Sequence, residues 1–459
     1  MKDWYLKNSR ETKAYNNTSN GSKSKPVLSV SLITALILSF ALCGCETKFD
    51  FDDSDSSGDV PAISFTESTV ADTGSENAIE VFDTDGEILT TNISVIEEAE
   101  REDNDSLMAA DKLPGIVDEI SDDDSSKYAY GQLSPSARNT YKEILSILKG
   151  FYEDVVLSVI DCDEIELAFK AVMIDHPEIF YVDGYTLGKY MVDGKLTKVT
   201  FSGSYTMTEE EAEAKKHLVD DYVENVILNS PVSDEYEKIK YVYEYLVENN
   251  EYDLLAQNDQ NVLSVVEGGR TVCQGYTKMF QLIMDRMGIF CTLVNGRATT
   301  GGSDVWEPHV WNIVRCNGQY YNVDVTWGDS VFDLINNSGG DSLTVDVNYE
   351  FLLAPDTELT GSHEAVPAVE IPSCTAMTDY YYVREGLYFD CVDEAKLKSA
   401  FDSEFEKGSK MIFIKTSDSN VFDDMCRHLF DEQHVFDYTG QNNARYVNLD
   451  TRKMIMISL

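Results

Sequence analysis

Apolar residues recur at steps of three and four between Cys273 and Met287, and this spacing predicts an amphipathic helix. Gly288 follows directly, and glycine commonly occupies the first position beyond the carboxyl end of a helix. The predicted helix begins at Cys273 and places this side chain in its first turn. Unpaired backbone N–H groups and the positive end of the helix dipole favour an anion at that point.

A second pattern, downstream of this helix, predicts a β-hairpin. Two runs of apolar and β-branched residues, 310–314 and 320–325, flank Asn317-Gly318, which is a strong signal for a two-residue hairpin loop. If these two residues form the loop, Cys316 pairs with Gln319. The register of the whole hairpin, and so the set of residues that share a face, follows from that one pair.

This register brings a histidine and a carboxylate together. His309 and Asp324 fall on the same face of the hairpin as diagonal neighbours, with the second strand continuing through Trp327. Diagonal partners have Cα atoms roughly 7–8 Å apart, which is within reach of a His–Asp hydrogen bond. A slip of one residue would put the two side chains on opposite faces, so the prediction depends on the loop.

Patterns elsewhere predict an α+β fold throughout, divided into three globular parts at 133–230, 231–356 and 357–459. Ser134 and Pro135 suit the start of one helix, Ser233 suits the start of another, and Asp193-Gly194 suits a hairpin turn. The elements predicted in the first and third parts are helices near 135–151, 164–174, 394–405 and 421–430, and strands at 185–192, 196–205, 410–415 and 454–458. The central part combines the Cys273 helix with antiparallel strands.

Residues 1–45 have the pattern of a bacterial lipoprotein signal peptide. Six basic and two acidic residues precede an apolar run from Val27 to Leu42. The run ends in Leu42-Cys43-Gly44-Cys45, which resembles a lipobox with Cys45 as the lipidated residue. The alternative is an uncleaved membrane anchor, for which the run is barely long enough. Both alternatives place the rest of the chain outside the cytoplasm, in the cell envelope.

Residues 46–132 have a different composition and predict an acidic, disordered tether. Positions 46–134 contain 25 Asp or Glu against 4 Lys or Arg, with little periodicity of apolar residues. Such a segment cannot bury enough apolar surface to offset its ordering entropy. As a flexible coil it would span roughly 50 Å, enough to hold a domain clear of a membrane surface.

The chain has a formal net charge of −46 and no basic patch in its sequence. Nucleic-acid binding is therefore disfavoured, as is electrostatic attachment to anionic lipid. Seven widely spaced cysteines follow the predicted lipidation site, without a C-x-x-C pair. This is no disulfide framework, although one bridge such as Cys374–Cys391 is conceivable. No cluster of His, Cys and carboxylate residues has metal-ligand spacing, so we predict no metal and no cofactor.

Cys273, His309 and Asp324 supply a thiol, an imidazole and a carboxylate in chain order. Taken singly, each has a simpler explanation as a buried cysteine, a core or surface histidine, or a turn carboxylate. Taken together, a thiol at a helix start and a register-matched His–Asp pair indicate a site for acyl transfer. A thiol attacks well only as the thiolate, which a neighbouring imidazolium stabilises.

These motifs resemble the transglutaminase-like superfamily of papain-like thiol enzymes, whose bacterial members carry C-x-G-Y, H-x-W-N and D-x-T-W segments. The matching segments are Cys273-Gln274-Gly275-Tyr276, His309-Val310-Trp311-Asn312 and Asp324-Val325-Thr326-Trp327. Further similarity lies in 175–181, 238–253, 349–353 and His363, so the resemblance runs from about residue 133 to the last residue. Val310 and Gly328 depart from the usual pattern without touching the triad.

The resemblance implies a nucleophile helix packed on an antiparallel sheet. It makes Cys273 the nucleophile, His309 the general base and then acid, and Asp324 the residue that orients the imidazole. Backbone amides of the helix start would hold the oxyanion. Further candidates for an oxyanion or substrate-wall role are Gln274, Tyr252, Trp311 and Trp327, although core packing explains Trp311 at least as well.

The expected function is that of a surface-anchored thiol enzyme acting on peptide or protein amides through a thioester. Hydrolysis is favoured because the sequence gives no sign of a tunnel for a second substrate. Transfer to a lysine amine, which would cross-link proteins as a transglutaminase does, uses the same triad and stays an alternative. A further alternative, of another class, is a non-catalytic surface module for binding or scaffolding.

Overall fold

The computed structural model describes residues 107–113, 127–299, 305–329 and 347–459, together with the backbone of strands at 13–16, 92–97, 332–334 and 343–345. Apart from the strand at 13–16, the predicted signal peptide with Cys45 lies outside the described residues, as does most of the predicted tether. Helices and strands occur in every described part of the fold, which confirms the α+β class. No described helix is both long and apolar enough to cross a membrane.

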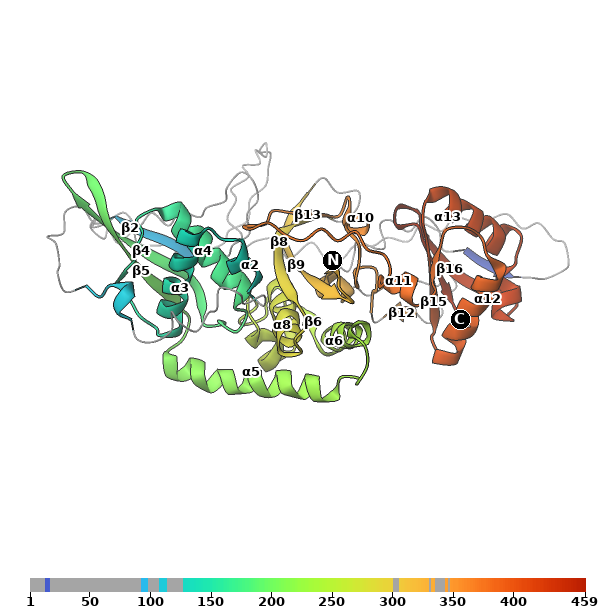
Figure 1. Ribbon diagram of the computed structural model, residues 1–459. Helices are drawn as coiled ribbons and strands as arrows, with labels where there is room; N and C mark the ends of the chain where they lie inside the picture. The colour runs from blue at the N-terminus through green and yellow to red at the C-terminus, as the bar shows by residue number, and fades with distance from the viewer. Residues whose placement is uncertain are drawn as a thin grey trace, which may run out of the picture. The chain divides into compact units, whose positions relative to one another are not determined.

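The first sheet has the strand order β2-β4-β5-β3 (Figure 1). Its long hairpin pairs β4 (Val182–Val192) with β5 (Lys195–Tyr205), and Asp193 and Gly194 form the loop with φ angles of 51° and 72°. Positive φ at both loop positions is typical of a type I′ turn, so the predicted hairpin is confirmed. The other elements of this part are β2 (Asn92–Glu97), η1 (Ala110–Lys112), α2 (Tyr128–Gln132), α3 (Pro135–Lys149), β3 (Val155–Val156) and α4 (Cys162–Asp175).

Three short pieces of the predicted tether belong to this first part, and one of them is helix α2, which buries Ala129 and Tyr130. β2 pairs in parallel with β4, and residues 107–113 contribute the buried side chains of Ala110 and Leu113. The structure thus differs from the expectation of a disordered segment up to residue 132. The physical reason is that apolar side chains near the end of the segment are buried against the first sheet and its helices.

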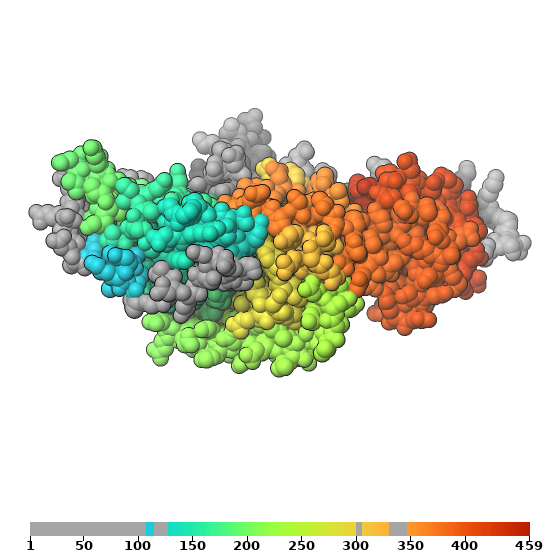
Figure 2. Space-filling view, viewed as in Figure 1, coloured from blue at the N-terminus to red at the C-terminus, as the bar shows by residue number. Residues whose placement is uncertain are grey.

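Helix α5 (Glu209–Asn229) has no counterpart among the predicted elements. It begins at a capping box, in which Thr208 and Glu211 each bond to the other's backbone. Only four of its side chains are buried, so its apolar pattern is weak. The helix runs along the lower edge of the view in Figures 1 and 2, and it packs against α7 (Leu263–Gly268) and α8 (Cys273–Arg286).

A four-stranded antiparallel sheet forms the central part, in the order β10-β9-β8-β13, with α8 packed against β8 and β9 (Figure 1). This is the predicted helix-on-sheet arrangement, although β13 lies beyond the predicted boundary at residue 356. The strands are β8 (Cys291–Ala298), β9 (Glu307–Cys316), β10 (Gln319–Val323) and β13 (His363–Ala365). The other central elements are α6 (Glu235–Asn249), β6 (Glu251–Tyr252), β7 (Arg270–Thr271), α9 (Val325–Gly328), β11 (Phe332–Leu334), β12 (Leu343–Val345) and α10 (Asp356–Leu359).

The central hairpin has the predicted register, because Cys316 pairs with Gln319. The prediction that its second strand continues through Trp327 is wrong, since β10 ends at Val323 and the short helix α9 follows. Asp324 accounts for the difference: its Oδ1 accepts a hydrogen bond from Trp327 N at 3.1 Å and caps α9. Local capping therefore ends the strand one residue before the carboxylate.

The carboxyl-terminal part is built on a five-stranded sheet in the order β1-β16-β17-β15-β14. The predicted helices and strands of this part are confirmed with small shifts at their ends. Its elements are β1 (Lys13–Asn16), α11 (Tyr381–Arg384), β14 (Tyr388–Phe389), α12 (Glu394–Lys407), β15 (Met411–Thr416), α13 (Ser419–Cys426), the π-helix η2 (Arg427–Asp431), α14 (Val435–Thr439), β16 (Asn443–Leu449), η3 (Asp450–Arg452) and β17 (Met454–Ser458). Cys374 and Cys391 are both free thiols, so they do not form the bridge considered above.

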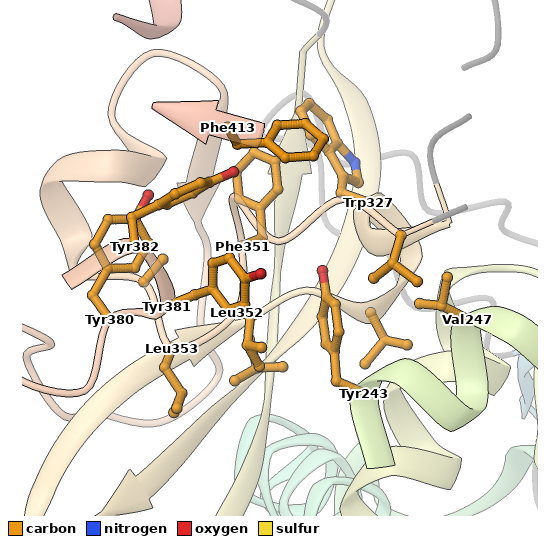
Figure 3. Packing of buried hydrophobic residues seen from close by; sticks show 14 of the residues in the cluster. Tyr243, Val247, Trp327, Phe351, Leu352, Leu353, Tyr380, Tyr381, Tyr382 and Phe413 are labelled. Atoms are coloured by element: carbon orange, nitrogen blue, oxygen red, sulfur yellow. The ribbon is translucent and has the colours of Figure 1, made fainter. Parts of the chain in front are cut away.

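Two clusters of buried hydrophobic side chains hold the described part together. One lies mainly in the first part, and the other runs through the central and carboxyl-terminal parts without a break. Figure 3 shows aromatic members of the second cluster from separate segments, among them Tyr243 of α6, Trp327, Phe351 and Phe413 of β15. Burying one such side chain contributes roughly 1.5–3 kcal/mol. The central and carboxyl-terminal parts therefore share one core.

Candidate active site

Cys273 is the first residue of α8, as predicted, and its side chain is half-buried. Val272 precedes the helix and makes no side-chain cap, so this residue does not occupy the N–H groups of the first turn. These groups and the helix dipole stabilise a negative charge at this end of the helix. An ionised sulfur and the oxygen of a tetrahedral intermediate are both charges of this kind.

Gly275 explains why the helix start can lie where it does. A Cβ atom at this position would be 1.9 Å from Thr271 Oγ1 and 2.8 Å from Ser264 Oγ. The absence of a side chain thus lets the first turn of α8 approach α7 and β7 closely. This close approach determines where the first turn of α8, and with it Cys273, lies relative to α7 and β7. The glycine of the C-x-G-Y segment therefore has a physical role.

Strand β9 and the end of β10 bring His309 and Asp324 together. His309 Nε2 lies 2.6 Å from Asp324 Oδ2, and the two side chains are only 5% and 2% exposed. Because Nε2 bonds to the carboxylate, Nδ1 is the nitrogen left for the thiol. The Cys273 side chain is close enough to the His309 ring to favour its charged form. The structure therefore brings His309 and Asp324 into direct contact, with Cys273 near enough to act electrostatically on the histidine.

The electrostatics of this group favour an ion pair. Burial on its own would lower the pKa of His309, but the charge and hydrogen bond of Asp324, followed by the interaction with Cys273, raise it to about 10. Burial opposes ionisation of Asp324, but His309 and then His363 outweigh it and lower the pKa of this carboxyl. At neutral pH the His309 ring is thus an imidazolium, which donates from Nε2 to Asp324.

A second imidazole, absent from the predicted site, shares the same carboxylate. His363 Nε2 lies 3.0 Å from Asp324 Oδ2, and its Nδ1 lies 2.9 Å from Ser362 Oγ. Burial lowers the pKa of His363 to about 4, so this ring is neutral near pH 7. An ionised carboxylate only accepts hydrogen bonds, so His363 donates from Nε2, which leaves Nδ1 of the neutral ring as an acceptor. The one hydroxyl proton of Ser362 is contested by this Nδ1 and by the Leu359 carbonyl oxygen, which lies 3.0 Å from Ser362 Oγ.

The sequence carried only a weak signal for His363. It lies 39 residues beyond Asp324, on the edge strand β13, and the resemblance includes it without giving it a role. The ligand atoms of His309, Asp324 and His363 lie within 4.8 Å of one another, close enough to surround a metal ion. The hydrogen bonds to the shared Asp324 oxygen already account for this closeness.

Trp311 and Trp327 are buried around the two imidazoles. Trp311 donates from Nε1 to Asn322 Oδ1 at 3.0 Å, and its ring lies 6.2 Å from that of His309 with the planes 19° apart. The ring of Trp327 lies 4.6 Å from that of His363. The two indoles therefore keep water away from the imidazoles and restrict their orientation. A contact of either indole with substrate stays a prediction.

The two remaining candidates lie beside the thiol. Gln274 is the second residue of α8 and is buried. Tyr252 of β6 is half-buried, and its backbone N–H donates to Asp329 Oδ2 at 2.9 Å. Burial, followed by the charge of Cys273, raises the pKa of the Tyr252 phenol. Its O–H group thus keeps its proton near the sulfur, as a donor to an oxyanion requires.

Comparison with known proteins relates part of this chain to one family. Residues 224–325 match the family model of the Transglutaminase-like superfamily. Kyphoscoliosis peptidase of Homo sapiens is 27% identical over 112 residues, which cover 22% of this chain and 17% of that protein. Its counterpart in Mus musculus is 27% identical over 124 residues, which cover 23% and 19%. The chain spans about a fifth of the length of these curated relatives.

A solved crystal structure of a TGase aligns with 41% of this chain and 52% of its own, at 15% identity and a TM-score of 0.23. A score this low supports no argument about the fold. The family match is the stronger finding, because the matched segment contains both α8 and the His–Asp hairpin up to Val325. Residues 224–325 of this chain are thus similar to the Transglutaminase-like superfamily.

Proposed function

We propose that this protein is a thiol enzyme that acts on peptide or protein amides through a thioester intermediate. Cys273 is the nucleophile, His309 is the general base and then acid, and Asp324 orients the imidazole. One observation carries the proposal: His309 is tied to Asp324 through Nε2 at 2.6 Å, and the same ring interacts electrostatically with a thiol at a helix start.

The chemistry follows from these contacts. The sulfur of Cys273, ionised by transfer of its proton to His309, attacks the carbonyl carbon of the amide. The oxygen becomes negatively charged near the first-turn N–H groups of α8, which stabilise it. His309 then gives its proton to the leaving amine, the C–N bond breaks, and a thioester remains. Asp324 keeps the ring aligned and stabilises its positive charge during both transfers.

Hydrolysis of the thioester is the favoured second half of the reaction. His309 takes a proton from water, the resulting hydroxide attacks the thioester carbonyl, and the sulfur leaves. One observation supports this outcome: the curated relatives bear the name peptidase. The net charge of −46 biases substrate choice weakly toward neutral or basic segments.

The decisive experiment incubates the protein with a glutamine-containing protein and a labelled primary amine, and reads new termini and incorporated amine together. New termini without incorporation support hydrolysis, whereas incorporation would make cross-linking the reaction. Cys273→Ser should abolish either product. Cys162→Ser, a matched control at another half-buried cysteine, should abolish neither. If a panel of such proteins gave neither product, the protein would instead be a binding or scaffold module.

Alkylation tests the ionised thiol apart from substrate choice. Iodoacetamide at neutral pH should label Cys273 much faster than Cys162 or Cys426, the other half-buried thiols of the described part, and acidification should slow the labelling. Equal rates for the three thiols would contradict the proposed ion pair.

We also propose that the protein is anchored to the outer face of a bacterial membrane by lipid on Cys45. The basic leader, the apolar run and the Leu42-Cys43-Gly44-Cys45 segment support this proposal. Metabolic labelling with a radioactive fatty acid should mark the wild-type protein and the control Cys43→Ser, but not Cys45→Ser. Incorporation into Cys45→Ser would remove this assignment.

A further inference from the structure

Two histidines and a glutamate of the carboxyl-terminal part form a cluster that plays no role in the proposed reaction. His428 lies in η2, Glu432 directly follows this π-helix, and His434 precedes α14. We propose that His428, Glu432 and His434 bind a divalent transition-metal ion, with Zn²⁺ as the best match to their chemistry.

The ring nitrogens are arranged as in a metal site. His428 Nδ1 lies 3.8 Å from Glu432 Oε2, and His434 Nε2 lies 3.9 Å from the same oxygen. Both separations are too long for a hydrogen bond, so the carboxylate faces two imidazole nitrogens without bonding to either. The rings themselves are stacked, with centroids 4.4 Å apart and planes 19° apart, so both present an edge to Glu432.

The opposite nitrogen of each ring is already held. His434 Nδ1 lies 2.9 Å from Asp437 Oδ2, and His428 Nε2 lies 3.0 Å from Tyr438 Oη. A metal-binding histidine usually donates its other N–H to a carboxylate or another acceptor, which fixes the tautomer and aims the free nitrogen at the ion. Asp437 and Tyr438 supply this second layer of contacts for both rings at once.

The distances require only a small closure. The three ligand atoms lie within 4.8 Å of one another, whereas bonds of about 2.0–2.1 Å to a tetrahedral ion place its ligands about 3.3 Å apart. Glu432 and His434 are 53% and 41% exposed, so side-chain rotation is able to supply the difference. His428, only 9% exposed, gives the fixed side of the site.

The backbone holds the cluster in a tight turn. Gln433 adopts a left-handed φ of 67°, and His434 N–H donates to the carbonyl oxygen of His428 at 3.3 Å. Acidic groups surround the rings: Glu432, Asp437 and Glu394 all act electrostatically on both histidines. A divalent cation would relieve the repulsion among these acids, which adds to the favourable energy of binding.

The ligand set selects the class of ion. Two imidazoles and one carboxylate suit Zn²⁺, Cu²⁺ or Ni²⁺ rather than Mg²⁺ or Ca²⁺, which prefer oxygen ligands. With three protein ligands, a fourth position is left for water or for a group from a partner. The spacing of the three residues, His-x3-Glu-x-His, differs from the patterns that usually mark zinc, so the sequence alone did not indicate the site.

The test is a titration of the untagged full-length chain with Zn²⁺ by calorimetry and with Co²⁺ by visible absorption. Accessible thiols are first alkylated, so that Cys273 cannot act as a ligand. We expect one ion per chain, and Co²⁺ bands free of the near-ultraviolet charge-transfer band that a thiolate ligand gives. Absence of saturable binding would overturn the proposal.

Variants at the exposed ligands make the assignment specific. His434→Ala and Glu432→Gln should weaken Zn²⁺ binding at least tenfold, and Asp437→Asn should weaken it about 10- to 100-fold by freeing the His434 ring. The control His217→Ala, at an exposed histidine whose nearest acid is Glu213 at 4.0 Å, should bind as the wild type does. Unchanged affinity in both His434→Ala and Glu432→Gln would refute the site.

Discussion

Replacing His363 by alanine removes one of the two imidazoles that hold Asp324. In the folded protein the neutral His363 ring donates to Asp324 Oδ2 at 3.0 Å, the same oxygen that accepts from His309 at 2.6 Å. Without this bond, His309 alone holds that oxygen, while Trp327 N holds the other. The carboxylate then rotates more freely, and the imidazole that depends on it is aimed less well.

The expected size of the effect follows from these contacts. A hydrogen bond to a charged group contributes roughly 1.5–3 kcal/mol. If all of it is lost from the transition state, the rate falls about 10- to 100-fold, because about 1.4 kcal/mol is a factor of ten. The substitution also leaves a cavity beside Trp327 and Phe351, whose rings lie 4.6 and 5.2 Å from His363. The free energy of unfolding should therefore fall by about 2–4 kcal/mol.

The assay measures kcat and KM for amide cleavage and the free energy of unfolding in urea for each variant. His363→Gln keeps a donor for Asp324 and should recover part of the rate, and Ser362→Ala should lose less than His363→Ala. A pH profile separates positioning from simple destabilisation. Without His363, more of the Asp324 charge acts on His309, so its pKa and the alkaline limb of the profile should move upward. A folded His363→Ala protein with wild-type kcat and an unchanged profile would refute this reasoning.

Three further predictions concern the helix start, the pH dependence of stability and the extent of the functional unit. Gly275→Ala should lower kcat and destabilise the fold by about 1–3 kcal/mol, because its Cβ would clash with β7 and α7. The control is Gly268→Ala, whose Cβ meets nothing within 4 Å. Equal effects of the two substitutions in urea unfolding and in activity would contradict this prediction. The pKa of His309 is raised to about 10, so its contribution to stability is complete below about pH 6.5 and is lost as the pH rises to 10. The pKa of His363 is lowered to about 4, so its contribution to stability is complete above about pH 6.5 and is lost as the pH falls to 4. Urea unfolding between pH 4 and pH 10 should show that His309→Gln loses the alkaline decrease in stability and that His363→Gln loses the acidic decrease. If the stability of both variants depended on pH as that of the wild type does, both assignments would be excluded. A chain cut at residue 356 lacks strand β13 and should be inactive and less stable by thermal unfolding, a prediction that wild-type activity of the shortened chain would disprove.

The elements that the sequence predicted well are those whose local chemistry determines them. Asn317-Gly318 permits only a tight turn, so the hairpin register followed from two residues. Gly288 adopts a φ of 72° and ends α8, which confirms the other boundary of the thiol-bearing helix. In both cases the backbone conformation is set by adjacent residues, and distant parts of the chain do not alter it.

The contacts that the sequence could not reveal depend on distant segments. His363 reaches Asp324 only because β13 pairs with β8, which no local pattern encodes. Asp324 was expected in a strand, but its side chain caps α9. Sheet pairing and helix capping compete at this residue, and its intrinsic strand or helix propensity does not decide between them. The same holds for the cluster at His428, whose members come together through a π-helix and a left-handed residue.

Side chains of the carboxyl-terminal part contact the residues that pack against the candidate active site. Glu350 is buried, and its Oε1 lies 3.6 Å from Lys415 Nζ and 3.4 Å from Arg452 Nη1, both of which come from the carboxyl-terminal part. Removing a cation from a buried carboxylate costs roughly 3–5 kcal/mol, so these pairs fix the position of Glu350. The next residue, Phe351, packs its ring 5.2 Å from that of His363 and 5.5 Å from the Arg452 guanidinium. Direct contacts therefore lead from Arg452 to the imidazole that holds Asp324, and the orientation of His309 depends on a residue 143 positions further along the chain.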